Sequence, residues 1–276
     1  MTNLIILSLN SFLTQKLLTY LHQIQHSFKI YIFTTSKNNL DKDLNIFPYS
    51  EIEKVTNNLG EGFIINFAGY NIFKAFLFPQ PLRDYLIWNT RIRFTQTLSS
   101  IVKKKFVFII PSAVWIYSQY LRKEFERWEN TVKNRDHIIF RLGIVLNQDS
   151  LWTKIFHRIL KLGIKPVFPD NFLFPYISVK KFMEVLIHKI NHYKQSEVIN
   201  LFYITSFNLF VNFLIEKMFK QNIYREYVQL NPFITKSLIY LIFGKYGKVF
   251  DSMDFSELDE NNPKLKMHED IEQCFT

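Results

Sequence analysis

The stretch LIILSLNSFLTQKLLTYLHQIQHSFKIYIFTT, residues 4–35, decides the fold of this chain. It opens with an apolar run at residues 4–7, as in a strand that is buried on both faces. A short polar break follows, and residues 12–24 then place apolar side chains at near-helical spacing. Residues 29–35, KIYIFTT, form a second strand-like run. The stretch therefore predicts a strand, a tight turn, a helix and a second strand.

The turn after the first strand has an unusual composition. A strand–turn–helix–strand unit of this size normally carries glycines there, because bare backbone can approach the pyrophosphate of a dinucleotide. Here the turn reads SLNSFLT at residues 8–14, and the first glycine of the chain is Gly60. The apolar pattern thus predicts the fold, whereas the binding activity depends on this turn.

Apolar runs and amphipathic stretches alternate along the rest of the chain. Strand-like runs occupy residues 63–68, 106–110, 137–146 and 197–204. Helical patterns occupy residues 82–102, 119–133, 151–162, 179–192 and 207–220. This alternation predicts an α/β protein with a Rossmann-type, doubly wound parallel sheet.

The spacing of the elements changes near residue 150, after which they are shorter and prolines mark irregular connections. We expect a nucleotide-binding-type domain over residues 1–150. A small C-terminal α/β lobe should follow over residues 151–250, with elements that return to the main sheet. Residues 251–276 are polar and acidic, so we expect a polar tail there.

Composition narrows the class of protein. A hydrophobic content of 48% excludes general disorder, and the single cysteine, Cys274, excludes an internal disulfide and a cysteine-based zinc site. No Lys or Arg precedes the first apolar run, which makes it a poor signal peptide. The longest uncharged run, residues 198–215, contains asparagines and fits a strand and a helix better than a membrane span. We expect the cytoplasm or an organellar matrix and no integral membrane protein.

The formal net charge is +10, yet the lysines are dispersed. The one tight cluster, residues 103–105, falls in an expected loop and is read as a solvated charge run. Most aromatic residues lie inside apolar runs, which indicates core packing rather than base stacking. A basic nucleic-acid or membrane-surface protein is therefore only a distant alternative.

Histidines occur in two pairs at i, i+4 spacing, His22 with His26 and His188 with His192. Such a pair can bind a metal from one helical face. Only Glu184 stands near as an acidic third ligand, and lysines surround the second pair. We predict no metal site.

Six short motifs occur in an order and spacing that match one enzyme family. They are SLNSFLT (8–14), INFAGYNI (65–72), WNTRIRFTQTL (88–98), IIPSAVWIYS (109–118), RWENTVKNRDHIIFRLGIVL (127–146) and YISVKKF (176–182). Together they resemble the extended short-chain dehydrogenases/reductases over about residues 1–250. The branch they resemble is that of the NAD-dependent epimerases/dehydratases, which includes nucleoside-diphosphate-sugar epimerases.

The resemblance implies a set of cofactor-binding positions. Ser8, Ser11 and Thr14 stand at the three glycine positions of the phosphate loop. The candidate cofactor-binding residues are Ser8, Asn10, Ser11, Phe12, Leu13, Lys37, Ala68, Gly69 and Arg91. An alternative is that the Ser and Asn residues of the turn only cap the first helix.

The residues after the second strand bear on the choice of cofactor. An acid there would bind the ribose diol of NAD, and an arginine the 2′-phosphate of NADP. The chain has neither, but Lys37 could contact a phosphate, which favours NADP over NAD if a cofactor binds. The alternative is a solvated lysine.

The resemblance also implies catalytic positions, with Ser112 as the active-site serine and Tyr117 as the tyrosine acid/base. Enzymes of this class place a lysine four residues after the tyrosine to lower its pKa, and here that position is Leu121. Tyr120 and Lys123, three apart on an expected helix, are a weaker alternative pair. Ser112 could equally be a small residue that closes a strand end.

Two functions follow, and the sequence favours the first. One is a non-catalytic homologue, a binding or structural subunit with lost or weakened cofactor binding and a protein partner or a second copy. The other is an active NAD(P)-dependent oxidoreductase or epimerase acting on a nucleotide-sugar-like small molecule. The fold is common to both, so it does not decide between them.

Overall fold

A computed structural model describes residues 1–35, 45–69, 78–170, 172–220, 226–243 and 245–253. Lys37 and the expected polar tail beyond residue 253 lie outside the described residues. The chain folds as two compact, interleaved units, and each draws on segments from both sides of residue 150. Unit 1 comprises Met1–Ala113, Glu124–Arg141 and Met183–Ile199, and unit 2 comprises Val114–Lys123, Leu142–Phe182 and Asn200–Thr276.

Unit 1 is built on a sheet in which seven strands of the described residues follow the order β10-β6-β5-β4-β1-β2-β3. Strands β1 to β5 pair in parallel. The strands are β1 (Thr2–Leu7), β2 (Phe28–Thr34), β3 (Asn45–Pro48), β4 (Gly62–Asn66), β5 (Phe106–Ala113), β6 (His137–Leu142) and β10 (Glu197–Leu201). The expected Rossmann-type sheet is confirmed.

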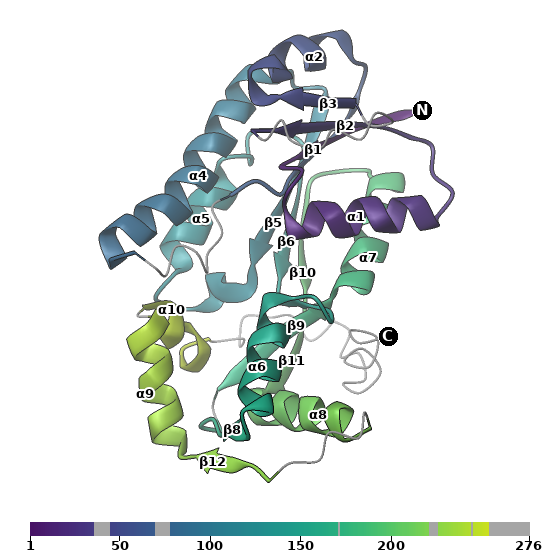
Figure 1. The fold of residues 1–276 in the computed structure, drawn as a ribbon. Helices are drawn as coiled ribbons and strands as arrows, with labels where there is room; N and C mark the ends of the chain where they lie inside the picture. Colours follow the sequence, from purple (N-terminus) through teal and green to yellow (C-terminus); the bar gives the residue numbers. More distant parts are fainter. Residues whose placement is uncertain (36–44, 70–77, 171, 221–225, 244, 254–276) are drawn as a thin grey trace. The chain divides into compact units, whose positions relative to one another are not determined.

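Helices cover both faces of this sheet. In Figure 1, α1 and α7 lie on one face, and α4 and α5 lie on the other. The helices of unit 1 are α1 (Phe12–Gln23), α2 (Ile52–Asn58), α4 (Gln80–Ile101), most of α5 (Arg122–Asn130) and most of α7 (Val179–Asn191). The central strand β1 is sandwiched between these layers, and its residues Leu4, Ile5, Ile6 and Leu7 are fully buried.

Helix α5 is shorter than the helix expected over residues 119–133. The residues before it form a short 3-10 helix, η2 (Val114–Tyr117). Ser118 then forms a β-bridge with Met253, which keeps the chain out of the helix there. Tyr120 therefore lies in a turn, two residues before α5 begins.

In unit 2, the described residues form a three-stranded sheet in the order β11-β9-β7 and a two-stranded sheet of β12 and β8. Its strands are β7 (Ile144–Leu146), β8 (Ile164–Pro166), β9 (Leu173–Ser178), β11 (Tyr203–Ser206) and β12 (Val228–Leu230). Its helices include α6 (Leu151–Lys161), α8 (Phe207–Lys220), α9 (Pro232–Phe243), the short α10 (Lys245–Lys248) and the 3-10 helix η3 (Val249–Asp251). Phenylalanines fill its core, with Phe174 stacked on Phe210 at 4.3 Å and Phe168 on Phe207 at 4.5 Å.

Two runs that the sequence pattern reads as single strands are each divided. Residues 137–146 are β6 and β7, separated at Gly143, and residues 197–204 are β10 and β11, separated at Phe202. At both points the chain leaves the seven-stranded sheet and enters the three-stranded one. A side chain at Gly143 would bring its Cβ within 2.6 Å of the Tyr176 amide nitrogen, so this crossing requires glycine.

The uncharged run at residues 198–215 forms β10, β11 and part of α8, as expected. Within the described ranges, the helices are too short or too polar to cross a membrane.

Candidate functional site

The first candidate site lies at the carboxyl edge of the seven-stranded sheet. Leu7, the last residue of β1, is in register with Phe33 on β2 and with Asn66 on β4. The turn after β1 and the segment after β4 therefore leave the sheet next to one another. Open α/β sheets bind their ligands at this edge, where adjacent strands end.

The turn after β1 has the backbone of a glycine turn without the glycine. Ser8 has a φ of +79°, a left-handed conformation that costs a residue with a side chain about 1–2 kcal/mol. Its amide donates to the Phe33 carbonyl at 2.8 Å, and its carbonyl accepts from the Ser11 amide at 3.2 Å. The Gln15 side chain, one helical turn further, donates to the Leu9 carbonyl at 2.8 Å and holds the loop.

Side chains occupy the positions at which bare backbone would approach a phosphate. Ser11 stands at the N-cap of α1 but makes no capping hydrogen bond, so its side chain does not cap the helix. Thr14 is fully buried, and its hydroxyl has no hydrogen-bond partner in the described part of the chain. Asn10 and Phe12 are exposed, and Leu13 is half-buried. The turn is therefore more crowded than a glycine loop.

Tyr49, which the sequence analysis did not single out, lies beside this turn. It directly follows β3, and its ring packs edge-on against Phe94 of α4 at 5.0 Å. Burial raises the pKa of Tyr49 to about 12, although a hydrogen bond with the Ser8 backbone acts in the opposite direction. The neutral phenol thus reaches the residue that begins the turn. The short NIFP run before it was the only sequence signal.

The end of β4 is fixed by a buried polar cluster. The Asn66 amide nitrogen donates to the Thr95 hydroxyl at 2.9 Å, and the Trp128 indole donates to the same oxygen at 3.2 Å. The Asn66 amide oxygen accepts from the Ala68 backbone at 3.1 Å. The cluster holds the Ala68 backbone in place at the carboxyl edge.

Three of the predicted cofactor-binding residues come together here. Gly69 packs on Arg91, since a Cβ at Gly69 would lie 3.0 Å from the Arg91 guanidinium carbon. Arg91 also lies over the Trp128 ring at 5.7 Å and donates to the Ile87 carbonyl at 3.0 Å. Ala68, Gly69 and Arg91 therefore form one surface after β4, whereas Lys37 lies outside the described residues.

Ser112, on β5, lies beside an internal ion pair between Glu129 and Arg141. Its hydroxyl donates to the Glu129 carboxylate at 2.8 Å. Arg141 binds the same carboxylate through two nitrogens, at 3.0 and 2.8 Å. Ser112 is 2% exposed and Glu129 1% exposed. Charge-assisted hydrogen bonds of this kind satisfy the buried carboxylate, and they occupy the serine hydroxyl. The Trp-Glu motif at residues 128–129 signalled Glu129 but not this role.

Tyr117 belongs to unit 2, whereas Ser112 belongs to unit 1. Tyr117 is 6% exposed, and its hydroxyl donates to the Asn200 amide oxygen at 2.7 Å. Leu121, four residues after Tyr117, is fully buried.

The alternative pair is not formed. Tyr120 precedes α5, and Lys123 lies inside it. The Tyr120 ring contacts Lys248 instead, at 5.7 Å. The expectation that Tyr120 and Lys123 share a helical face is therefore wrong, because the helix begins at Arg122.

In the part of the chain that the structure describes, no three His, Cys, Asp or Glu side chains are grouped as metal ligands. His188 and His192 stack on each other at 4.3 Å, and the His192 ring hydrogen-bonds the His188 carbonyl.

Solved structures of other proteins share this fold, although their sequences differ widely from this one. The chain matches no family model, and no curated protein matches it in sequence. The human epimerase family protein SDR39U1 (isoform 2), solved with NADPH, superimposes with a TM-score of 0.69 at 14% identity, covering 91% of this chain and 89% of that one.

Two bacterial proteins show the same relationship. The UDP-glucose 4-epimerase of Thermotoga maritima, solved with UDP-glucose, has a TM-score of 0.60 at 15% identity, covering 84% of this chain and 86% of that one. The enzyme WbmG of Bordetella bronchiseptica, solved with NAD, has a TM-score of 0.61 at 12% identity, covering 91% and 92%. The resemblance expected from the sequence is confirmed by these structural neighbours, and at such identities it concerns the fold. The chain has the fold that NAD-dependent epimerases and dehydratases share.

Proposed function

We propose that this chain is a non-catalytic protein with an epimerase/dehydratase fold, in which NAD(P) binding is weakened or lost. It acts as a binding or structural subunit in the cytoplasm or an organellar matrix, together with a protein partner or a second copy of itself.

The observation that carries this proposal is the burial and hydrogen bonding of two hydroxyls, those to which the resemblance gives catalytic roles. Ser112 and Tyr117 are 2% and 6% exposed, and their hydroxyls donate hydrogen bonds to the internal acceptors Glu129 and Asn200, respectively. A general acid must lie within hydrogen-bond reach of its substrate. Two buried hydroxyls with internal partners suit a structural role better than proton transfer to a ligand.

The turn after β1 gives independent support. Pyrophosphate binding at a helix N-terminus relies on close approach to bare backbone. Here Ser11 carries a side chain at the second glycine position, and Tyr49 reaches the backbone of the first, Ser8. The residues present therefore fit a pyrophosphate poorly.

One observation favours the alternative, an active NAD(P)-dependent oxidoreductase or epimerase acting on a nucleotide-sugar-like substrate. Ser8 keeps the left-handed backbone, with a φ of +79°, that a glycine turn requires. Ala68, Gly69 and Arg91 also remain grouped at the neighbouring strand end. Both features would suit a dinucleotide if the side chains of the turn moved aside.

Cofactor titration of the purified protein separates the two. NADPH and NADH are added while intrinsic fluorescence and thermal unfolding are followed. We expect no saturable change up to about 1 mM cofactor, which corresponds to less than about 4 kcal/mol of binding free energy. A dissociation constant in the micromolar range would contradict the proposal.

A matched variant sharpens the result. Replacing Ser8, Ser11 and Thr14 together by glycine restores the bare backbone, and we expect it to gain measurable NADPH binding. Size-exclusion chromatography and affinity capture with the full chain test the partner. A strictly monomeric protein that captures no specific partner would contradict the subunit role.

A further inference from the structure

A cavity of about 390 Å³ opens at the opposite edge of the seven-stranded sheet, and the function proposed above makes no use of it. Its walls are the segments that lead into β5, β6 and β10, at the amino ends of these strands. It is thus separate from the carboxyl edge that carries the candidate cofactor site. The lining residues are Lys104, Lys133, Asn134, Arg135, Asp136 and Ser196.

The lining is cationic. The lining holds three cations, Lys104, Lys133 and Arg135, and one carboxylate, Asp136, which gives a formal charge of +2. Among the described residues, neither Lys104 nor Lys133 has a hydrogen bond or an ion pair. Unpaired cations around a concave surface raise the local concentration of anions.

Arg135 supplies a fixed and largely buried charge. It is 8% exposed, and its Nη1 donates to the carbonyls of Ser99 and Val102, at 2.8 and 2.7 Å. Its Nη2 donates to the Lys103 carbonyl, and its guanidinium lies over the Phe108 ring at 4.7 Å. These contacts, made at the end of α4, fix the plane and position of the guanidinium.

The same contacts leave part of the guanidinium unused. The Nε of Arg135 is buried and has no hydrogen-bond partner in the described part of the chain, and Nη2 retains a second hydrogen. Nε is closed to solvent, so the remaining Nη2 hydrogen is the one left for a ligand oxygen. Burial lowers the pKa of Arg135, and the Asp136 charge partly offsets this. An anion beside the guanidinium would stabilise its charge further.

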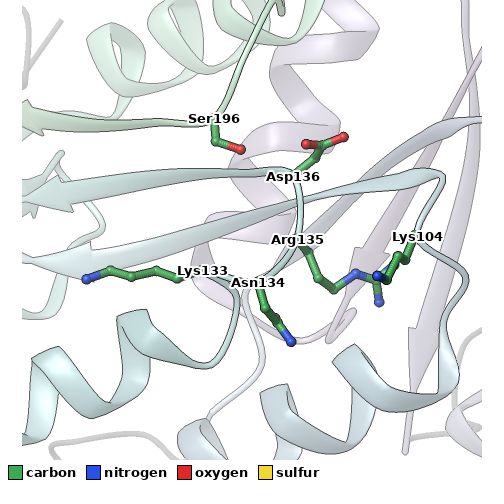
Figure 2. A pocket seen from close by; sticks show the side chains of 6 residues that line it. All are labelled: Lys104, Lys133, Asn134, Arg135, Asp136 and Ser196. Carbon is green, nitrogen blue, oxygen red and sulfur yellow. The ribbon is translucent and has the colours of Figure 1, made fainter.

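We propose that this cavity binds the phosphate group of a small molecule between Lys104 and Arg135. In Figure 2 these two side chains point toward one another, while Asp136 and Ser196 lie together on another side of the cavity. Lys133 extends away from them in this view and contributes long-range attraction. A dianion matches the lining charge of +2, whereas a carboxylate would leave it half compensated. The phosphate comes either from free phosphate or from a phosphate ester.

Isothermal titration at constant ionic strength tests the site, with inorganic phosphate in one arm and ribose 5-phosphate in the other. We expect saturable binding, weakened at least about tenfold in the double variant Lys104→Gln/Lys133→Gln. These lysines are exposed, so the double variant should fold. Lys54→Gln, at an exposed lysine of α2, is the matched control and should bind like the parent protein.

A gain-of-binding variant makes the test stricter. Asp136→Asn removes the one carboxylate of the lining and should tighten phosphate binding by about threefold or more. Tighter binding of ribose 5-phosphate than of phosphate would identify an ester as the ligand, and equal binding would identify free phosphate.

Two results would overturn the proposal. One is a signal no larger than that of chloride at the same ionic strength. The other is saturable binding that the double lysine variant and Asp136→Asn leave unchanged. Neither result depends on whether NADPH binds, because the cofactor positions lie at the other edge of the sheet.

Discussion

The turn after β1 and the Ser112 cluster lie at the ends of two strands of one sheet, and they differ in what is fixed. In the turn, Ser8 has a left-handed backbone. In the cluster, the Ser112 hydroxyl is directed to Glu129. Neither a backbone conformation nor a residue type is by itself sufficient for a site. The hydrogen-bond partner decides what the group can do.

The largest expected effect concerns the cluster. Glu129→Ala leaves the Arg141 charge and the buried Ser112 hydroxyl without their acceptor, so the free energy of unfolding should fall by about 3–5 kcal/mol. Urea unfolding measures it. Glu126→Ala, at an exposed position of the same helix, should change stability by less than about 0.5 kcal/mol. Equal effects of the two variants would show that Ser112 is not held by the ion pair.

The next effect concerns Tyr49 and pH. The pKa of Tyr49 is raised to about 12 in the folded protein, above the unfolded value of 10.0, so protonation of the phenol favours the folded state. This contribution is present below pH 10 and is lost as the pH rises through about 12. Between pH 10 and about pH 12, the free energy of unfolding of Tyr49→Phe should therefore fall by about 2 kcal/mol less than that of the parent protein.

Absorbance at the phenolate band during alkaline titration, combined with chemical unfolding at each pH, measures this linkage. The control is Tyr85→Phe, because Tyr85 is exposed. If the parent and Tyr49→Phe lose stability in parallel, the Tyr49 phenol is not buried against the turn.

A smaller effect tests the turn itself. Ser8→Gly relieves the left-handed backbone and should raise the free energy of unfolding by about 0.5–1 kcal/mol. Ser11→Gly has the opposite sign, because Ser11 has an ordinary φ of −69° and glycine adds only chain entropy. Thermal or urea unfolding compares the pair. A destabilised Ser8→Gly would indicate that the serine side chain contributes more than its backbone costs.

The smallest effect concerns Thr14, whose buried hydroxyl lacks a partner. Thr14→Val replaces the hydroxyl by a methyl of similar size, so stability should rise by up to about 1 kcal/mol. Urea unfolding is again the measurement. A clear loss of stability would mean that this hydroxyl has a polar partner, such as a bound water, in solution.

The sequence predicted the framework because that information is local. The apolar runs at residues 4–7 and 106–110 form β1 and β5 as expected, since a strand buried on both faces needs such a run. The breaks at Gly143 and Phe202 were not foreseen, because an apolar run does not reveal which sheet each half joins. The strand β3 was missed for a simpler reason: four residues are too few to show a period.

The sequence predicted the candidate site only where its residues belong to a motif of the resemblance. Ala68, Gly69 and Arg91 were located through their motifs, and the structure brings them together. The inward direction of Ser112 depends on Glu129 and Arg141, which stand on other elements. Such long-range partners leave no local pattern. Tyr49 likewise acquires its position from the pairing of β2 with β3.

A crystal of this protein soaked with NADPH tests the central claim most directly. We predict no dinucleotide density beside residues 8–13, and a Ser112 hydroxyl that stays hydrogen-bonded to Glu129 at about the 2.8 Å seen here. A bound dinucleotide with its pyrophosphate on the amino end of α1, and a Ser112 hydroxyl released toward the ligand, would contradict it.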